Sequence, residues 1–151
     1  MDNGNLFSFF RRITEIPRDS GDEKEIAEYL LSFAKERGLE AVTDEVHNVV
    51  IRKPGTSGYE EAPAVVLQSH SDMVYIKSDD SSHDYQSPLK VVEKDGFLSA
   101  EGTSLGADNG IGMAMTLAIL DNADLSHPPL EALFTTDEET GMDGVNHLSP
   151  F

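Results

Sequence analysis

Two stretches near the amino end of the chain carry apolar residues at helical spacing. Over residues 6–16 the apolar side chains recur every three or four positions, and Pro17 ends the pattern. Residues 22–37 show the same period, with acidic residues at the start and Gly38 just after the end. The pattern therefore predicts two amphipathic helices separated by a turn at residues 18–21.

The pattern then changes to short apolar runs that are typical of β-strands: residues 39–44, 47–52, 64–68, 89–92, 97–100 and 130–136. The first two runs are predicted to pair as a hairpin. The fourth and fifth flank Asp95-Gly96, a dipeptide typical of tight hairpin turns. Residues 64–68 are almost continuously apolar, which indicates a strand buried on both faces, and residues 130–136 predict another buried strand.

A glycine-rich stretch, residues 102–112, leads into a helix that continues to about Leu120. This helix is apolar almost all round, so we expect it to be buried. Residues 141–148 are predicted to begin one more helix. Helices and strands in this order predict an α/β fold, a layered domain in which helices flank a mixed β-sheet. The chain stops as a new element begins, so we expect a truncated chain, with a natural end as the alternative.

The composition excludes several classes of function. The chain of 151 residues has a formal net charge of −17, which repels phosphate backbones, so we expect no nucleic-acid partner. We interpret the charge mainly as a source of solubility, and secondly as a supply of metal ligands. There is no cysteine, which excludes disulfides and thiolate sites and fits a reducing compartment. With neither a signal peptide nor a membrane-spanning apolar run, we expect a cytoplasmic protein without membrane contact.

Three polar clusters lie where ligand sites of α/β sheets gather, beyond strand ends and before the buried helix. His70 and Asp72 follow the strand at residues 64–68, Asp108 precedes the buried helix, and Glu138 and Glu139 follow the last strand. Asp72 is two positions after His70, so in extended chain it can bind the far nitrogen of the imidazole. The adjacent glutamates repel each other unless a cation is near. Imidazole with carboxylates and no thiol suits zinc, manganese or cobalt.

Two other interpretations of these clusters stay open. Residues 102–106 match the G-x-S-x-G pattern of serine hydrolases, with Ser104 as the nucleophile and with Asp137 and His147 in hydrolase order. However, no buried strand directly precedes this pattern and no helix directly follows it. The other interpretation is a non-enzymatic acidic or metal-binding module built from solvated turns and helix caps, although His70 argues against calcium.

Several segments together resemble a known family: Ile16-Pro17 and residues 48–54, 65–74, 102–114 and 138–144. In order and spacing they are similar to aminoacyl-histidine dipeptidases (Xaa-His dipeptidases, peptidase D). These belong to the co-catalytic zinc metallopeptidases, with carnosinases, aminoacylases and tripeptidase. The resemblance covers essentially the whole chain, and the form Gly-Ala-Asp-Asn-Gly-Ile-Gly points to the dipeptidase branch. It implies the zinc-peptidase (phosphorylase/hydrolase-like) fold.

The resemblance implies a role for each candidate residue in the hydrolysis of dipeptides. His70 would bind one zinc ion, Asp108 would bridge two, and Glu139 would bind the second. Asp72 would orient His70, and Glu138 would be the general base for a water activated between the two ions.

The resemblance also implies parts that this chain lacks. Residues 1–151 would be the N-terminal portion of the catalytic domain, incomplete at its C-terminus. The remaining ligands, an acidic residue and a histidine, and the lid domain that forms the homodimer would lie beyond Phe151. Each zinc would keep only two protein ligands here, whereas a catalytic zinc usually has three. We therefore expect the chain alone to bind metal weakly and to have little or no peptidase activity.

Overall fold

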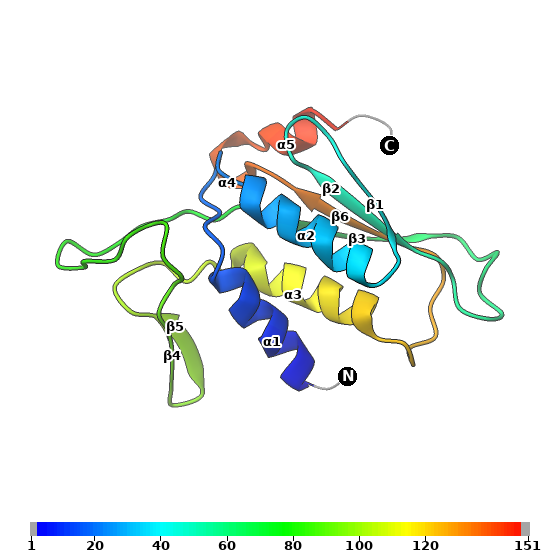
Figure 1. Ribbon diagram of the computed structural model, residues 1–151, viewed down its shortest axis with the longest axis horizontal. Coiled ribbons are helices and arrows are strands. Elements are labelled where there is room, and N and C mark those ends of the chain that lie inside the picture. Colours follow the sequence, from blue (N-terminus) through cyan, green and yellow to red (C-terminus); the bar gives the residue numbers. More distant parts are fainter. Residues whose placement is uncertain (1–2, 149–151) are drawn as a thin grey trace.

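Two long helices cover one face of a mixed β-sheet, and a third packs against one of them, in the computed structural model, which describes residues 3–148 (Figure 1). The helices and strands, in chain order, are α1 (Asn3–Thr14), α2 (Lys24–Glu36), β1 (Glu40–Thr43), β2 (Val49–Lys53), β3 (Val65–His70), β4 (Val91–Lys94), β5 (Phe97–Ala100), α3 (Ala107–Asp121), β6 (Leu130–Thr135), α4 (Glu138–Gly141) and α5 (Asp143–Asn146). This arrangement confirms the predicted α/β fold with a mixed sheet flanked by helices.

The four-stranded sheet has the order β1-β2-β6-β3. β1, β2 and β6 are antiparallel to their neighbours, whereas β3 runs parallel to β6. The predicted hairpin of the first two strands is confirmed. The parallel pair places the carboxyl ends of β3 and β6 side by side, which brings His70 next to Thr135 in the register. The residues that follow these two strands therefore meet at one edge of the sheet.

The prediction that the strand at residues 64–68 is buried on both faces is wrong. Among the described residues β3 has a neighbour on one side only, so it is an edge strand. Val65 and Val66 at its start point to opposite faces of the sheet, and both are exposed, at 44% and 55%. Only its last two residues, Ser69 and His70, are buried. An apolar run does not distinguish an edge strand from a central one.

The core lies between the helices and the sheet. Phe10 of α1, Leu30 of α2 and Leu117 of α3 belong to one buried cluster with Ile51 and Phe134 of the sheet. Each such side chain contributes roughly 1.5–3 kcal/mol to folding by leaving water. α3 is buried over most of its surface, as its apolar sequence predicted.

No helix of residues 3–148 is both long and apolar enough to cross a membrane.

The two segments around the candidate site differ from their predicted helices. α3 begins before residue 112, at Ala107, and the backbone at Asp108 and Asn109 is not helical and is joined by a cis peptide bond. Instead of one helix over residues 141–148, two short helical turns, α4 and α5, begin at Glu138.

The strands β4 and β5 form the predicted hairpin, with left-handed backbone at Asp95 and Gly96 as a type I′ turn requires.

Candidate metal centre

The imidazole of His70 lies at the meeting point of the three polar clusters. His70 ends β3 and is buried. Its Nδ1 is 3.2 Å from a carboxylate oxygen of Asp72. Its Nε2 is 3.1 Å from Oδ1 of Asp108 and 3.9 Å from Oε2 of Glu138. The structure therefore brings together side chains that are far apart in the sequence, at the edge of the sheet where they were expected.

Asp72 holds His70 on the side away from Asp108. Its buried carboxylate accepts hydrogen bonds from the hydroxyl of Ser20 at 2.8 Å and from the backbone amides of Glu138 at 3.1 Å and Glu139 at 3.2 Å. Burial would raise the pKa of Asp72, but the hydrogen bonds from His70, Ser20 and these amides outweigh burial and hold the pKa well below its usual range. Asp72 is thus ionised and ties the imidazole to the start of α4.

The carboxylates around His70 favour its protonated form. Burial lowers the pKa of His70, but the hydrogen bond and charge of Asp72, followed by Asp108 and Glu138, outweigh burial and raise the pKa to about 9. The site therefore attracts positive charge, which without a metal is a proton on the imidazole. A metal ion would take the place of that proton, because a ligating imidazole must be neutral.

A divalent cation fits the donor atoms of this cluster. His70, Glu138 and Glu139 each offer one ligand atom, and the three atoms lie within 4.8 Å of one another. The side chain of Asp108, which is 83% exposed, faces the same imidazole nitrogen. An imidazole and carboxylates without a thiol are a donor set for zinc, manganese or cobalt. Since both glutamates reach the cluster, the geometry alone does not divide the roles of ligand and base between them.

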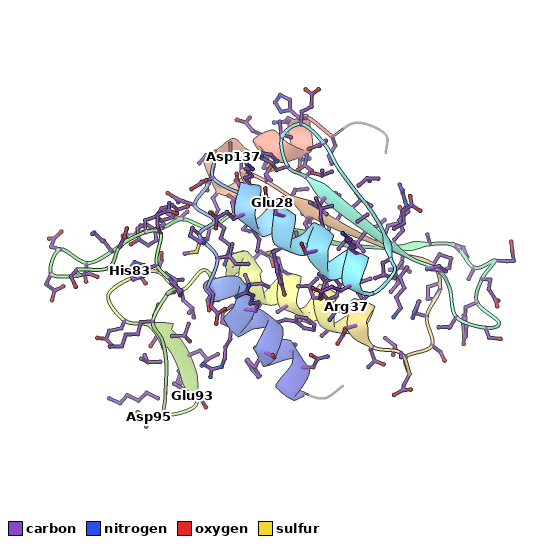
Figure 2. All side chains as sticks on the ribbon, in the orientation of Figure 1. Glu28, Arg37, His83, Glu93, Asp95 and Asp137 are labelled. Atoms are coloured by element: carbon purple, nitrogen blue, oxygen red, sulfur yellow. The ribbon has the colours of Figure 1, made fainter. Side chains whose placement is uncertain are left out.

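A second acidic group, formed by Glu23, Asp72 and Asp137, lies beside the first and serves a different purpose. Oε1 of Glu23 accepts hydrogen bonds from the backbone amides of Gly21 and Asp137, both at 2.9 Å. Burial raises the pKa of Glu23, and the charge of Asp72 adds to that effect. Glu23 thus fastens the turn before α4 to the start of α2, near the labelled Asp137 in Figure 2. The sequence showed Glu23 only as an acidic residue at a helix start.

The largest difference from the sequence prediction at this site is Arg18. Residues 18–21 were predicted only to form a turn, but Arg18 in that turn is a buried charged side chain, only 1% exposed. Burial lowers the pKa of Arg18 to about 10, partly offset by the charge of Asp72, so the guanidinium is charged at neutral pH. A charged residue after Pro17 gave no signal of burial, because its environment comes from segments distant in the sequence.

The serine-hydrolase alternative is not favoured by the contacts of its residues. Oγ of Ser104 donates to the carbonyl of Val74 at 2.8 Å and accepts from the amide of Ile76 at 3.0 Å. Nδ1 of His147 is 2.8 Å from the carbonyl of Asp143, within its own helical turn. Ser104 therefore joins two loops, and the hydrogen bonds of residues 3–148 do not connect it to His147.

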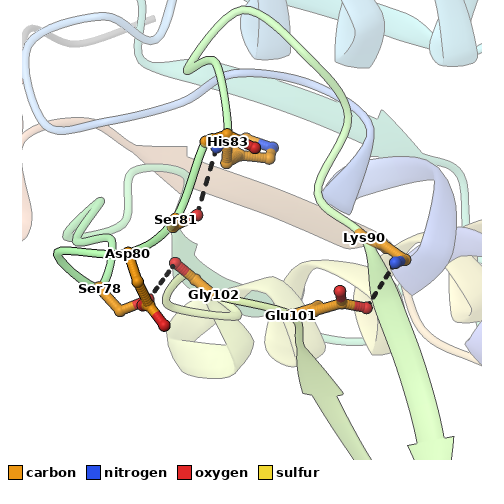
Figure 3. Close-up of a pocket in the computed structure, with 8 residues that line it drawn as sticks. Ser78, Asp80, Ser81, His83, Lys90, Glu101 and Gly102 are labelled. Atoms are coloured by element: carbon orange, nitrogen blue, oxygen red, sulfur yellow. Dashed lines mark hydrogen bonds and ion pairs between the residues drawn. The ribbon is translucent and has the colours of Figure 1, made fainter.

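A separate polar hollow of about 520 Å³ lies between the loop after β3 and the β4–β5 hairpin (Figure 3). Figure 3 shows Lys90 paired with Glu101 on one side, and Ser81 hydrogen-bonded to the backbone of His83 on the other. The Lys90–Glu101 ion pair measures 2.5 Å. His83 also contacts the hydroxyl of Tyr75 at 2.8 Å. These residues pair among themselves, and the hollow contains none of the predicted metal ligands.

Two known proteins match nearly the whole of this chain. The cytosol non-specific dipeptidase of Escherichia coli (strain K12) is 46% identical over 141 residues, which cover 93% of this chain and 29% of that protein. The crystal structure of an aminoacylhistidine dipeptidase from Vibrio alginolyticus matches with a TM-score of 0.93 and 42% identity, over 98% of this chain and 30% of that one. This chain thus spans less than a third of the length of both relatives.

A more distant structure shares the fold. It is a Bacillus subtilis protein described as a dinuclear metal binding peptidase from the M20 family, with a TM-score of 0.52 and 15% identity, over 90% of this chain and 36% of that one. The model of the peptidase family M20/M25/M40 matches residues 66–150. This match covers more than half of the chain and includes all five candidate residues, from His70 to Glu139. The chain therefore belongs to peptidase family M20/M25/M40.

Proposed function

We propose that this chain provides part of the catalytic centre of a metal-dependent dipeptidase that acts on aminoacyl-histidine (Xaa-His) dipeptides. The observation that supports the proposal most is the meeting of His70, Asp72, Asp108 and Glu138 at one edge of the sheet, in a chain of a peptidase family. The names of the Escherichia coli and Vibrio alginolyticus relatives support the dipeptide as substrate. The first of these names also supports a cytosolic location.

The proposed ligands are His70, Asp108 and Glu139, which would hold two zinc ions, with manganese or cobalt as substitutes. Asp108 would be a ligand of both ions, His70 a ligand of one and Glu139 a ligand of the other. Bound ions would polarise the peptide carbonyl and lower the pKa of the attacking water toward neutrality. Asp72 would keep Nε2 of His70 directed at the cluster, because it already holds Nδ1 of the same ring at 3.2 Å.

Glu138 is the proposed general base. Its carboxylate is partly exposed at the site and lies 3.9 Å from Nε2 of His70, so it is close to the cluster and open to substrate. It would accept a proton from the attacking water and then pass that proton to the leaving amine. The backbone amide of Glu138 donates a hydrogen bond to the carboxylate of Asp72, and this bond holds the backbone from which the Glu138 side chain extends.

The activity of the whole protein would need more than these residues. We propose that segments corresponding to the remainder of the relatives supply further ligands, a lid over the substrate and the contacts of a homodimer. The present chain would then be the N-terminal portion of the catalytic domain. The alternatives of a serine hydrolase and of a non-enzymatic acidic module have no comparable support from the contacts or the family.

Metal binding by the chain tests this proposal. After treatment with a chelator, the wild-type chain is titrated with Zn²⁺ in a calorimeter, and we expect weak but measurable binding. His70→Ala removes the central donor and should abolish that binding. His83→Ala is the matched control, because His83 belongs to the separate polar hollow and should leave binding unchanged. Equal Zn²⁺ binding by the wild type and His70→Ala would contradict the proposed centre.

A further inference from the structure

The guanidinium of Arg18 connects two loops that are remote in the sequence. Its Nη1 donates to the backbone carbonyls of Ser71 at 3.1 Å and Asp72 at 2.9 Å. Its Nη2 donates to the backbone carbonyl of Gly106 at 2.5 Å. One buried side chain therefore bridges the loop after β3 and the loop before α3.

Two glycines leave the space that this guanidinium occupies. A Cβ atom at Gly106 would lie 2.5 Å from Nη2 of Arg18, and a Cβ atom at Gly110 would lie 2.8 Å from the same nitrogen. Both distances are shorter than non-bonded atoms tolerate. Gly106 also has a φ of +66°, which favours glycine for a second reason. The position of Arg18 therefore requires glycine both just before α3 and inside it.

Each of the two bridged loops adjoins a candidate metal ligand, at the end of β3 or the start of α3. Ser71, whose carbonyl accepts from Arg18, directly follows His70, and Gly106 is two residues before Asp108. The two ligands meet at 3.1 Å between Nε2 of His70 and Oδ1 of Asp108. Movement of either loop would change this distance, and the contacts of Arg18 oppose such movement at the base of both loops.

The chemistry of arginine suits this bridge better than that of any other residue. A planar guanidinium presents donors in a fixed fork, so it can bind carbonyls of separate segments in one geometry. It also places a permanent positive charge near the ionised Asp72, whose charge counteracts the cost of burying Arg18. A lysine ammonium keeps the charge but not the fork.

We propose that Arg18 is a positioning residue of the metal centre, which sets the spacing of His70 and Asp108 by holding their two loops together. This inference rests on the proposed function, since it assumes that these two residues bind metal. Arg18 itself would not touch the metal or the substrate, because its donors are directed at backbone carbonyls.

Cobalt binding tests the proposal, because the visible spectrum of bound Co²⁺ reports the geometry of its ligands. Arg18→Ala is compared with the wild type at a temperature where circular dichroism shows both to be folded. We expect Co²⁺ to bind about 10- to 100-fold more weakly, as when a residue that orients metal ligands is lost. We also expect a changed spectrum, and partial recovery of both properties when methylguanidinium is added to fill the empty space.

Arg37→Ala is the matched control, because it removes another arginine side chain that is partly buried but lies away from the metal centre. Arg37 forms a 2.6 Å ion pair with Asp121 at the end of α2 that is remote from Asp137 (Figure 2). Its loss should lower stability and leave the affinity and spectrum of Co²⁺ unchanged. A purely structural role of Arg18 would give the same result as this control.

Arg18→Lys keeps the test decisive if Arg18→Ala does not fold. Lysine retains the charge near Asp72 but cannot bridge the three carbonyls, so we again expect weaker Co²⁺ binding and a changed spectrum. Wild-type affinity and spectrum in a folded Arg18 variant would overturn the role of Arg18 and leave the proposed function intact. Failure of the wild-type chain to bind Co²⁺ or Zn²⁺ would instead overturn the proposed function, and this inference with it.

Discussion

At the scale of single residues, the adjacent Glu138 and Glu139 offer the sharpest test of the proposed mechanism. The test uses a chimera in which this chain replaces the matching 30% of the Vibrio alginolyticus dipeptidase. Glu138→Gln removes the proposed base but no proposed ligand, so hydrolysis of carnosine should fall by at least about 100-fold while zinc content stays unchanged. Initial rates and zinc content by atomic absorption measure the two effects.

Glu139→Gln is the natural comparison, because it makes the same chemical change one position later. As a proposed ligand, Glu139 should lose zinc and activity together in the chimera. If Glu138→Gln loses zinc, or if it hydrolyses carnosine at near the parent rate, the assignment of Glu138 as the base fails. The two variants therefore distinguish the general base from the metal ligand, whereas the positions of Glu138 and Glu139 would allow either residue to take either role.

The residues that sequence reasoning found and missed differ in one physical respect. His70 and Glu138 follow apolar strands, so a local pattern marks them as neighbours of a sheet edge. Arg18 and Glu23 owe their burial to segments 50 or more residues away, which no local pattern records. Charged residues near a turn and a helix start are usually solvated, and here that expectation fails.

At the scale of elements, Asp121 joins the three long helices α1, α2 and α3. It is the last residue of α3, and it accepts hydrogen bonds from Asn5 of α1 at 2.9 Å and from Arg37, which follows α2, at 2.6 Å. Burial would raise the pKa of Asp121, but the hydrogen bonds from Asn5 and Arg37 and the charges of Arg37 and Lys53 outweigh burial and lower the pKa. The ionised carboxylate therefore stabilises the helical layer.

The lowered pKa of Asp121 predicts how its contribution depends on pH. Because its pKa is lower in the folded than in the unfolded chain, the stabilisation is present above the unfolded value of 3.8 and is lost as pH falls through the folded value. Asp121→Asn should lower the free energy of unfolding by about 1 kcal/mol at pH 7. The difference from wild type should shrink as pH falls below about 4. Urea denaturation at several pH values measures it.

Asp124→Asn controls for the change in net charge near the same helix end. Asp124 is exposed, and the change should alter the free energy of unfolding by no more than about 0.5 kcal/mol. A pH-independent effect of Asp121→Asn, or an effect no larger than that of Asp124→Asn, would show that the ionised carboxylate does not stabilise the helices.

The spacing of apolar residues predicted amphipathic elements well, but it did not predict burial that depends on the place of a strand in the sheet. α2 and the two hairpins agree with their predictions to within a few residues, because amphipathic spacing and Asp95-Gly96 act locally. The position of β3 at the sheet edge is a property of the whole sheet, so its run of valines gave the wrong burial. Residues 107–109 were predicted as part of a glycine-rich loop, and although α3 begins at Ala107, the backbone at Asp108 and Asn109 departs from helical geometry.

At the scale of the whole molecule, we propose that the described residues form part of a metal centre that other segments complete. His70 is the only histidine in the metal cluster formed by residues 3–148, and the remaining donors are carboxylates. Two zinc ions sharing His70, Asp108 and Glu139 would each have fewer than the three protein ligands usual for catalytic zinc. The side chain of Asp108 is also largely exposed, so water reaches the proposed centre.

Activity should therefore depend on groups outside this chain. The purified 151-residue chain, supplied with Zn²⁺, should release little or no histidine from carnosine, whereas the chimera with the Vibrio alginolyticus dipeptidase should release it readily. Both proteins are assayed at equal concentration, with a chelator-treated sample and the His70→Ala chain as blanks. Chelator-sensitive hydrolysis by the wild-type chain at a rate near that of the chimera, absent from His70→Ala, would mean that residues 1–151 already contain a complete centre. The proposal that other segments complete it would then be wrong.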